Sequence, residues 1–115
     1  MWYISYVTLI ISQTMNYLQL NFHSDAGHGW LKVTTHQLAE LGIYNQVSRY
    51  SYINVAYSND DESYDVYLEE DCDAPLFLNT LKDQDIAFTI NYINDGDNSF
   101  IRRKHHFPNQ QTQTI

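Results

Sequence analysis

The stretch that decides the fold is YDVYLEEDCDAPLFLNTL, residues 64–81, because it combines a strand, a turn and a helix in immediate succession. Its first five residues, YDVYL, have the β-branched and aromatic composition of a strand. Asp71 or Asp73 can cap the helix that follows, and Pro75 falls in its first turn, where a missing N–H costs nothing. One face of this helix is apolar and is formed by Leu76, Phe77 and Leu81.

The residues before this unit predict two strands and a short helix. Residues 16–23 and 30–33 have strand-like patterns and are separated by a turn that contains two glycines. Thr34 and Gln37 have the spacing of a capping box, which predicts a helix over residues 35–41. The chain therefore enters the central stretch after a ββα unit.

Two further hairpins are predicted around the central stretch. Residues 47–57 are rich in tyrosine and predict a long strand that pairs with residues 64–68. Residues 86–93 and 99–107 lie on either side of the turn NDGDN and predict the last hairpin. The order ββα-ββα-ββ predicts an α+β domain with a mainly antiparallel sheet of about five to six strands and two short helices on one face.

The length of 115 residues suits one domain, which we expect to span residues 15–107. Residues 1–14 are apolar and contain no charge, and they form either a first strand or a translated leader ahead of a natural start at Met15. This segment is too short to span a bilayer and lacks the basic start and cleavage site of a secretory signal. Residues 108–115 are predicted to be a disordered polar tail.

The net charge of −8 comes from one part of the chain. Eight acidic residues and no basic residue fall between Arg49 and Lys82, whereas acids and bases balance elsewhere. A concentrated negative field favours association with a basic protein, although such a block also serves simply as a solvated face. The residues predicted to contact a partner are Asp60, Asp61, Glu62, Asp65, Tyr67, Glu69 and Glu70.

The acidic string EEDCD at residues 69–73 has three interpretations: helix capping, a calcium site, or part of this contact surface. It lacks the alternating ligand positions and the internal glycine of an EF-hand loop. The single cysteine, Cys72, excludes an intrachain disulfide. The neighbouring carboxylates disfavour its thiolate, so we expect a half-buried structural thiol rather than a nucleophile.

The histidines give an alternative, enzymatic hypothesis. A metal-dependent or acid–base centre could assemble from Asp25, His28 and either His105 or His106, and His23 with Asp25 and His28 are the candidate metal ligands. No metal-binding or nucleophile motif of established spacing accompanies them. We therefore predict no metal and no cofactor.

The only basic cluster, Arg102-Arg103-Lys104, would be split between two faces of a strand, which does not favour nucleic-acid binding. The cluster is expected to pair with the acidic block of the same molecule or of a second copy, so a homo-oligomer is an open possibility. The sequence predicts a cytoplasmic protein that binds neither nucleic acid nor a membrane.

The strings GHGWLKV at residues 27–33, YSY at 50–52 and YLEEDCDA at 67–74 resemble small uncharacterised proteins of bacterial phages, plasmids and other accessory DNA. The resemblance covers about residues 15–107. It implies a genomic setting and no specific activity. Small acidic proteins from that setting are often inhibitors of host defence complexes, anti-CRISPR proteins among them. The predicted function is therefore a non-enzymatic protein-binding module, with inhibition of such a complex as its extension.

Overall fold

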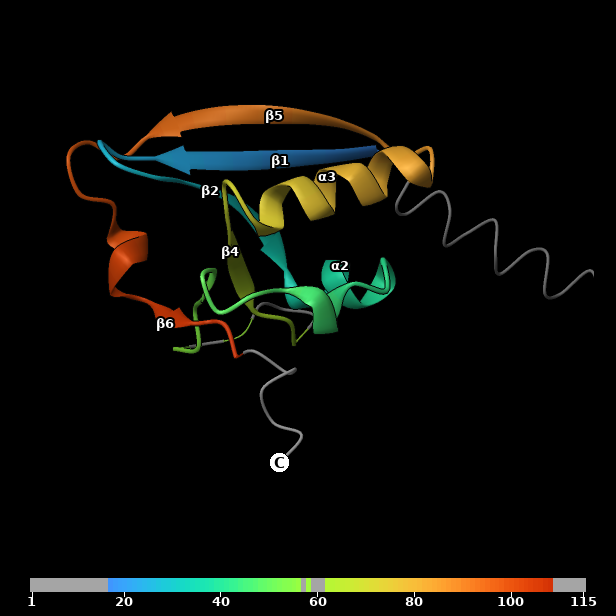
Figure 1. Ribbon diagram of the computed structural model, residues 1–115, viewed down its shortest axis with the longest axis horizontal. Coiled ribbons are helices and arrows are strands. Elements are labelled where there is room, and N and C mark those ends of the chain that lie inside the picture. The colour runs from blue at the N-terminus through green and yellow to red at the C-terminus, as the bar shows by residue number, and fades with distance from the viewer. Residues whose placement is uncertain (1–16, 57, 59–61, 109–115) are drawn as a thin grey trace, which may run out of the picture.

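The computed structural model describes residues 17–56, 58 and 62–108, which form one sheet with helices packed against it (Figure 1). Residues 1–14 and most of the predicted tail lie outside this part of the chain. The strands are β1 (Tyr17–Ser24), β2 (Gly29–Thr34), β3 (Tyr52–Ile53), β4 (Asp65–Glu69), β5 (Ala87–Asn94) and β6 (His105–His106). The helices are α2 (Thr35–Glu40) and α3 (Asp73–Asp83), with short 3-10 helices η1 (Tyr44–Gln46) and η2 (Phe100–Arg103). The predicted α+β fold class is confirmed.

The six strands form a single sheet in the order β5-β1-β2-β4-β3-β6. Neighbouring strands are antiparallel except β1 and β5, which run parallel from Tyr17 opposite Ala87 to Ser24 opposite Asn94. Parallel strands require a long crossover connection, and α3 supplies it between β4 and β5. The sheet is therefore mixed but mostly antiparallel.

The predicted hairpin between residues 86–93 and 99–107 is wrong. The Asp95 N–H donates to the Ser24 carbonyl at 2.7 Å, and the Ser99 N–H donates to the Asp25 carboxylate at 2.9 Å. These bonds hold the chain at the β1–β2 turn instead of returning it along β5. It then crosses the sheet through η2, and β6 pairs with β3 at the opposite edge.

The predicted long strand over residues 47–57 is also wrong, because within the described residues 47–56 only the two residues of β3 pair with β4. The preceding segment uses its polar groups elsewhere. The Ser48 N–H and hydroxyl and the Ser51 hydroxyl all donate to the buried carboxylate of Asp73. A continuous strand would withdraw these donors from α3 and leave a buried charge without partners.

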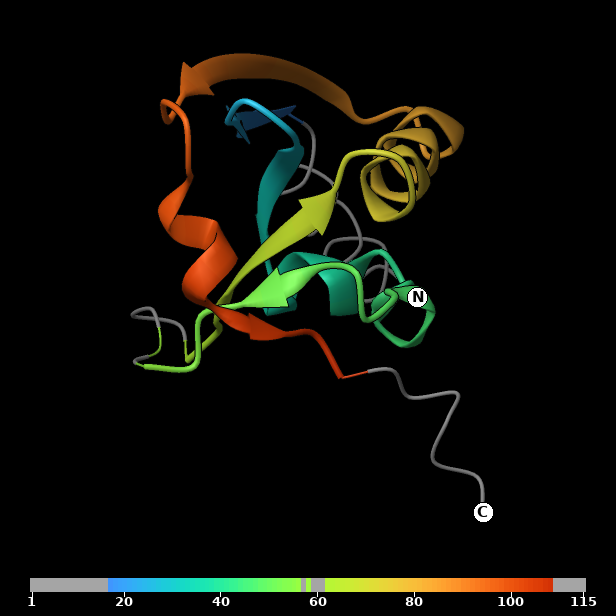
Figure 2. The same cartoon turned by 60° about the vertical axis from the view of Figure 1, so that its left-hand side comes forward.

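The two helices cover one face of the sheet, as predicted, and η2 crosses the other face (Figure 2). The capping box of α2 is present, because Thr34 Oγ1 accepts from the Gln37 N–H at 3.1 Å and Gln37 Oε1 accepts from the Thr34 N–H at 3.0 Å. Leu38 of α2 and Phe77 of α3 are fully buried in the main core. None of the helices in the described residues is long and apolar enough to cross a bilayer.

Candidate functional site

The acidic stretch is not one surface, because β4 separates its two ends. Asp60 and Asp61 lie outside the described residues, and Glu62 is exposed shortly before β4 begins. Glu70 and Asp71 are exposed in the turn after β4. The five residues of β4 extend roughly 16 Å at about 3.3 Å per residue, so the two ends belong to different surfaces.

Of the predicted contact residues between these ends, Asp65 and Glu69 are bonded to neighbouring groups, and Tyr67 is buried. Asp65 is 3.7 Å from the ammonium of Lys32 across the β2–β4 pair. The Glu69 carboxylate accepts from the N–H groups of Asp71 and Cys72 at 2.9 and 3.0 Å. Tyr67 is only 4% exposed, which corrects its prediction as an exposed contact residue. It is buried because its face of β4 is the one that η2 covers.

Asp73 has a structural role in the described fold. It is 4% exposed and accepts the hydrogen bonds of Ser48 and Ser51. The prediction that Asp71 or Asp73 caps α3 is wrong, because Cys72 occupies that position and makes no side-chain capping bond. Asp73 is the first residue of α3, where its negative charge still complements the helix dipole.

A pocket of about 320 Å³ lies between the turn after β4, the start of β3, η2 and β6. We call it the Trp30 pocket, after the large side chain that η2 packs against. Its lining consists of His28, Trp30, Tyr50, Tyr52, Glu69, Asp71, Cys72, Arg102 and His106. It therefore combines aromatic rings with two carboxylates, and one of these, Glu69, is among the predicted contact residues.

The pocket has an aromatic side formed by three elements. The rings of Trp30 and Tyr52 meet edge to face, with centroids 6.3 Å apart. The ring of His106 stacks on Tyr52 at 4.6 Å, and its Nδ1–H donates to the Arg49 carbonyl at 2.7 Å. Because that carbonyl can only accept, Nε2 of a neutral His106 is left as an acceptor.

Arg102 enters this pocket as part of a neutralised pair. Its Nε and Nη2 donate to the two oxygens of Asp25 at 2.6 and 2.9 Å, and its guanidinium lies 5.5 Å from the centre of the Trp30 ring. The Asp25 carboxylate also accepts from the N–H groups of Ser99, Gly27 and His28. Arg102, followed by these backbone donors, holds the pKa of Asp25 far below its usual range, although burial acts in the opposite direction. Asp25 is thus ionised near neutral pH and is unsuited to act as a general base there.

The other histidines of the enzymatic hypothesis are only partly brought together. His28 and His106 share the pocket, whereas His105 lies opposite Ile53 and is exposed. His23 does not line the pocket and pairs instead with Asp95, Nδ1 to Oδ2 at 3.1 Å, with its ring edge to face against Phe100. Among the described residues, no three histidine, cysteine or acidic side chains converge as a metal site would require.

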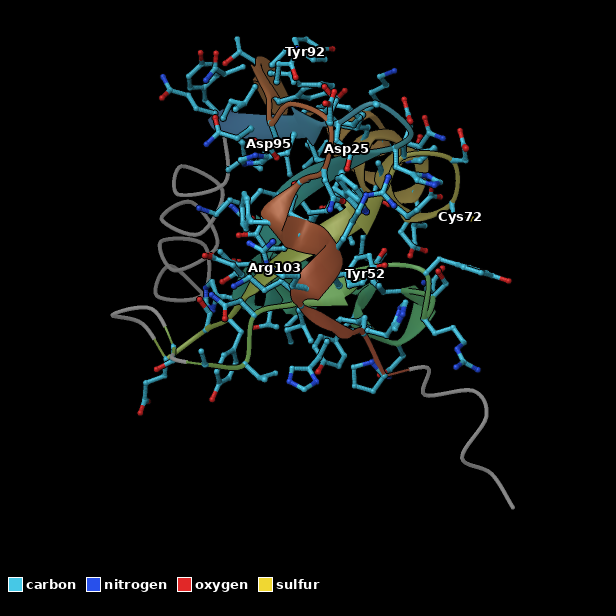
Figure 3. The ribbon with its side chains drawn as sticks, turned by 90° about the vertical axis from the view of Figure 1, so that its left-hand side faces the viewer. Asp25, Tyr52, Cys72, Tyr92, Asp95 and Arg103 are labelled. Carbon is cyan, nitrogen blue, oxygen red and sulfur yellow. The ribbon has the colours of Figure 1, made fainter. Side chains whose placement is uncertain are left out.

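In the described part of the chain, no ion pair joins the basic cluster to the acidic stretch. Arg102 binds Asp25, and the Lys104 ammonium lies 5.8 Å from the centre of the Phe100 ring. Figure 3 shows Tyr52 and Cys72 on one side of η2 and Arg103 on the other. The cluster is divided by the 3-10 geometry of η2 rather than by the alternation of a strand.

Cys72 is exposed at the pocket, contrary to the expected half-burial. Desolvation, followed by the carboxylates of Glu69, Asp73 and Asp71, raises the pKa of its thiol, so the expectation of a disfavoured thiolate is confirmed. The part of this change that comes from the three carboxylates reflects a negative local potential.

No known protein family matches this chain, and neither the curated proteins nor the solved structures give a match. The geometry itself therefore describes the site: an open pocket with aromatic walls and a negatively charged rim. The sequence did not single out Trp30 or Tyr52 for this site. The alternation of GWLKV could have identified Trp30, because it places this residue on the face opposite Leu31 and Val33.

Proposed function

We propose that this protein is a small, non-enzymatic binding module that docks on a basic surface of another protein through the rim of the Trp30 pocket. The observation that carries the proposal is the exposure of Glu70 and Asp71 beside the aromatic pocket. In the described part of the chain, neither side chain has a lysine or arginine within ion-pair distance.

Charge and shape both support this use of the surface. Arg102, the cation that lines the pocket, is already matched by Asp25. The charge that remains in the lining comes from Glu69 and Asp71 and is negative. Tyr50, which is 64% exposed, adds a ring with a polar end, the kind of side chain that is enriched in protein interfaces.

The proposal extends to a cytoplasmic protein from a phage, plasmid or other mobile element that inhibits a host defence complex. This extension depends on the sequence resemblance described above. Such complexes expose basic surfaces where they bind nucleic acid, and a protein with net charge −8 is suited to compete for them.

Charge reversal at matched sites tests the docking surface. The rim variant carries Glu70→Lys and Asp71→Lys, and the control carries Glu62→Lys and Asp83→Lys, which change the net charge equally at exposed positions away from the pocket. A partner captured by the native protein should be retained by the control and lost by the rim variant, with a strong dependence on salt. Equal retention by the two variants, or equal loss, would refute docking through this rim.

A second candidate function is acid–base catalysis by His28 and His106, which the pocket brings together. Asp25 cannot share that role while it holds Arg102. Elemental analysis of protein purified without a His tag tests the metal-dependent form of this hypothesis. A stoichiometric metal would support it, and a metal-free protein would remove that form.

A further inference from the structure

We infer that the Trp30 pocket receives a single arginine side chain of the partner. This inference rests on the proposed function and adds the chemistry by which the pocket recognises its ligand. The volume of about 320 Å³ is at the lower end of the roughly 300–1,000 Å³ of ligand pockets, which suits one long side chain better than a larger molecule.

The aromatic side favours a flat cation. Guanidinium groups stack on aromatic faces and are more weakly hydrated than ammonium groups, so they lose less on entering a partly dry pocket. Tyr50 and Tyr52 line the pocket, and His106 is stacked on Tyr52. The aliphatic part of an arginine would cover apolar surface while its head group reached the rim.

The carboxylates supply the counter-charge. Asp71 lines the pocket and is exposed, and Glu69 stands beside it with its carboxylate oriented by two backbone N–H groups. A carboxylate can accept two parallel hydrogen bonds from a guanidinium, which an ammonium cannot reproduce. Because Asp25 neutralises Arg102, the side chains that line the pocket keep a net negative charge although Arg102 is one of them.

The raised pKa of the Cys72 thiol agrees with this balance. Desolvation is its largest cause, and the charges of Glu69, Asp73 and Asp71 act in the same direction. An anionic ligand would meet the same repulsion, so a carboxylate or phosphate held by Arg102 is the competing outcome that the experiment must separate.

The test is a titration of the isolated protein with four capped amino acids: the amides of N-acetylarginine, N-acetylcitrulline, N-acetyllysine and N-acetylglutamate. Citrulline keeps the shape of arginine without its charge. The indole N–H resonance of Trp30, assigned with a Trp2→Phe variant, reports occupancy by NMR. We expect arginine to bind with a dissociation constant on the order of 1–10 mM, lysine at least threefold more weakly, and citrulline not measurably.

Two matched variants locate the binding. Asp71→Asn removes a charge from the pocket lining and should weaken arginine binding roughly five- to tenfold. Glu70→Gln removes a charge from the neighbouring exposed residue, which does not line the pocket, and should change it less than about twofold.

Several outcomes would overturn the inference: equal binding of citrulline or lysine, tighter binding of N-acetylglutamate amide, or equal effects of the two variants. Because the titration uses no partner, it can fail while the charge-reversal experiment succeeds. In that case the pocket ligand is wrong and docking through the rim stands. If arginine binds but rim reversal does not change partner capture, the pocket ligand stands and docking through the rim is wrong.

Discussion

The two faces of the sheet are packed with different chemistry, although they share the same strands. On the helix side, aliphatic residues such as Leu31, Val33 and Leu68 meet Phe77 of α3 in a continuous apolar core. On the other side, Trp30 and the residues around it form a small aromatic cluster beneath η2. Adjacent residues of one strand, Trp30 and Leu31, therefore serve different parts of the molecule.

The difference also concerns how the covering element is held. Apolar burial, which is not directional, stabilises the body of α3 against the sheet, and hydrogen bonds from Ser48 and Ser51 hold its first residue, Asp73. The segment around η2 is instead fixed by hydrogen bonds, from Arg102 and Ser99 to Asp25, and from Ser99 and His23 to Asp95. The helix face supplies most of the stability, whereas the η2 face sets the geometry of the pocket.

The largest expected effect is on the helix face. Phe77→Ala should lower the free energy of unfolding by about 3–5 kcal/mol, because the fully buried ring leaves a cavity in the main core. Urea denaturation followed by circular dichroism measures this loss. In the fraction that remains folded, arginine binding at the pocket should be unchanged. A loss below 1 kcal/mol would mean that the core collapses around the smaller side chain and that the contrast between the faces is weaker than described.

A smaller loss is expected from the same kind of change on the η2 face. Ile101→Ala should cost about 2–3 kcal/mol, in the lower part of the usual range, because the small cluster beneath η2 can close partly around the gap. Unlike Phe77→Ala, this variant should also weaken arginine binding, because Ile101 is the buried residue of η2, the helix that carries Arg102. Unchanged arginine binding in a destabilised Ile101→Ala variant would show that the pocket does not depend on how η2 packs against the sheet.

The smallest effect is expected from changing Asp25, whose carboxylate attaches η2, and it is seen in how the stability of the fold depends on pH. The folded-state pKa of Asp25 lies below the unfolded value of about 3.9, so its ionised form stabilises the fold above that pH. This contribution is lost as the pH falls through the folded-state pKa. Asp25→Asn should therefore be less stable than the native protein at pH 7, and its stability should fall less steeply between pH 5 and pH 2.

Urea midpoints across this pH range measure the difference. Asp83→Asn, at an exposed position near the end of α3, is the matched control and should follow the native curve. Parallel curves for the native protein and Asp25→Asn would contradict the role of the Asp25–Arg102 pair.

Much of the fold could be predicted from local patterns. The capping box at Thr34, the position of Pro75 in the first turn of α3 and the alternation of β2 depend on interactions within a few residues. The segment at residues 47–57 misled the prediction, because its strand propensity is outweighed by the demand of the distant Asp73 for hydrogen-bond donors. The turn at residues 94–98 misled it in the same way, since Asp95 and Ser99 bond to the β1–β2 region instead of closing a hairpin.

The candidate site shows the same limit. The sequence drew attention to Glu69, His28 and His106, but not to the pocket that they share with Trp30 and Tyr52. It also gave Asp25 a chemical role, whereas its carboxylate is fully occupied by Arg102 and backbone donors.

The amino-acid sequence alone determined the fold class, most of the strand and helix positions, and the concentration of negative charge in the middle of the chain. Side-chain periodicity and composition are local properties, so a single chain displays them directly. The tertiary structure decided which strands are neighbours, which acidic residues remain exposed, and that Arg102 reaches Asp25 across 77 positions. These outcomes depend on long-range packing and on the need of every buried polar group for a partner, which no local pattern records.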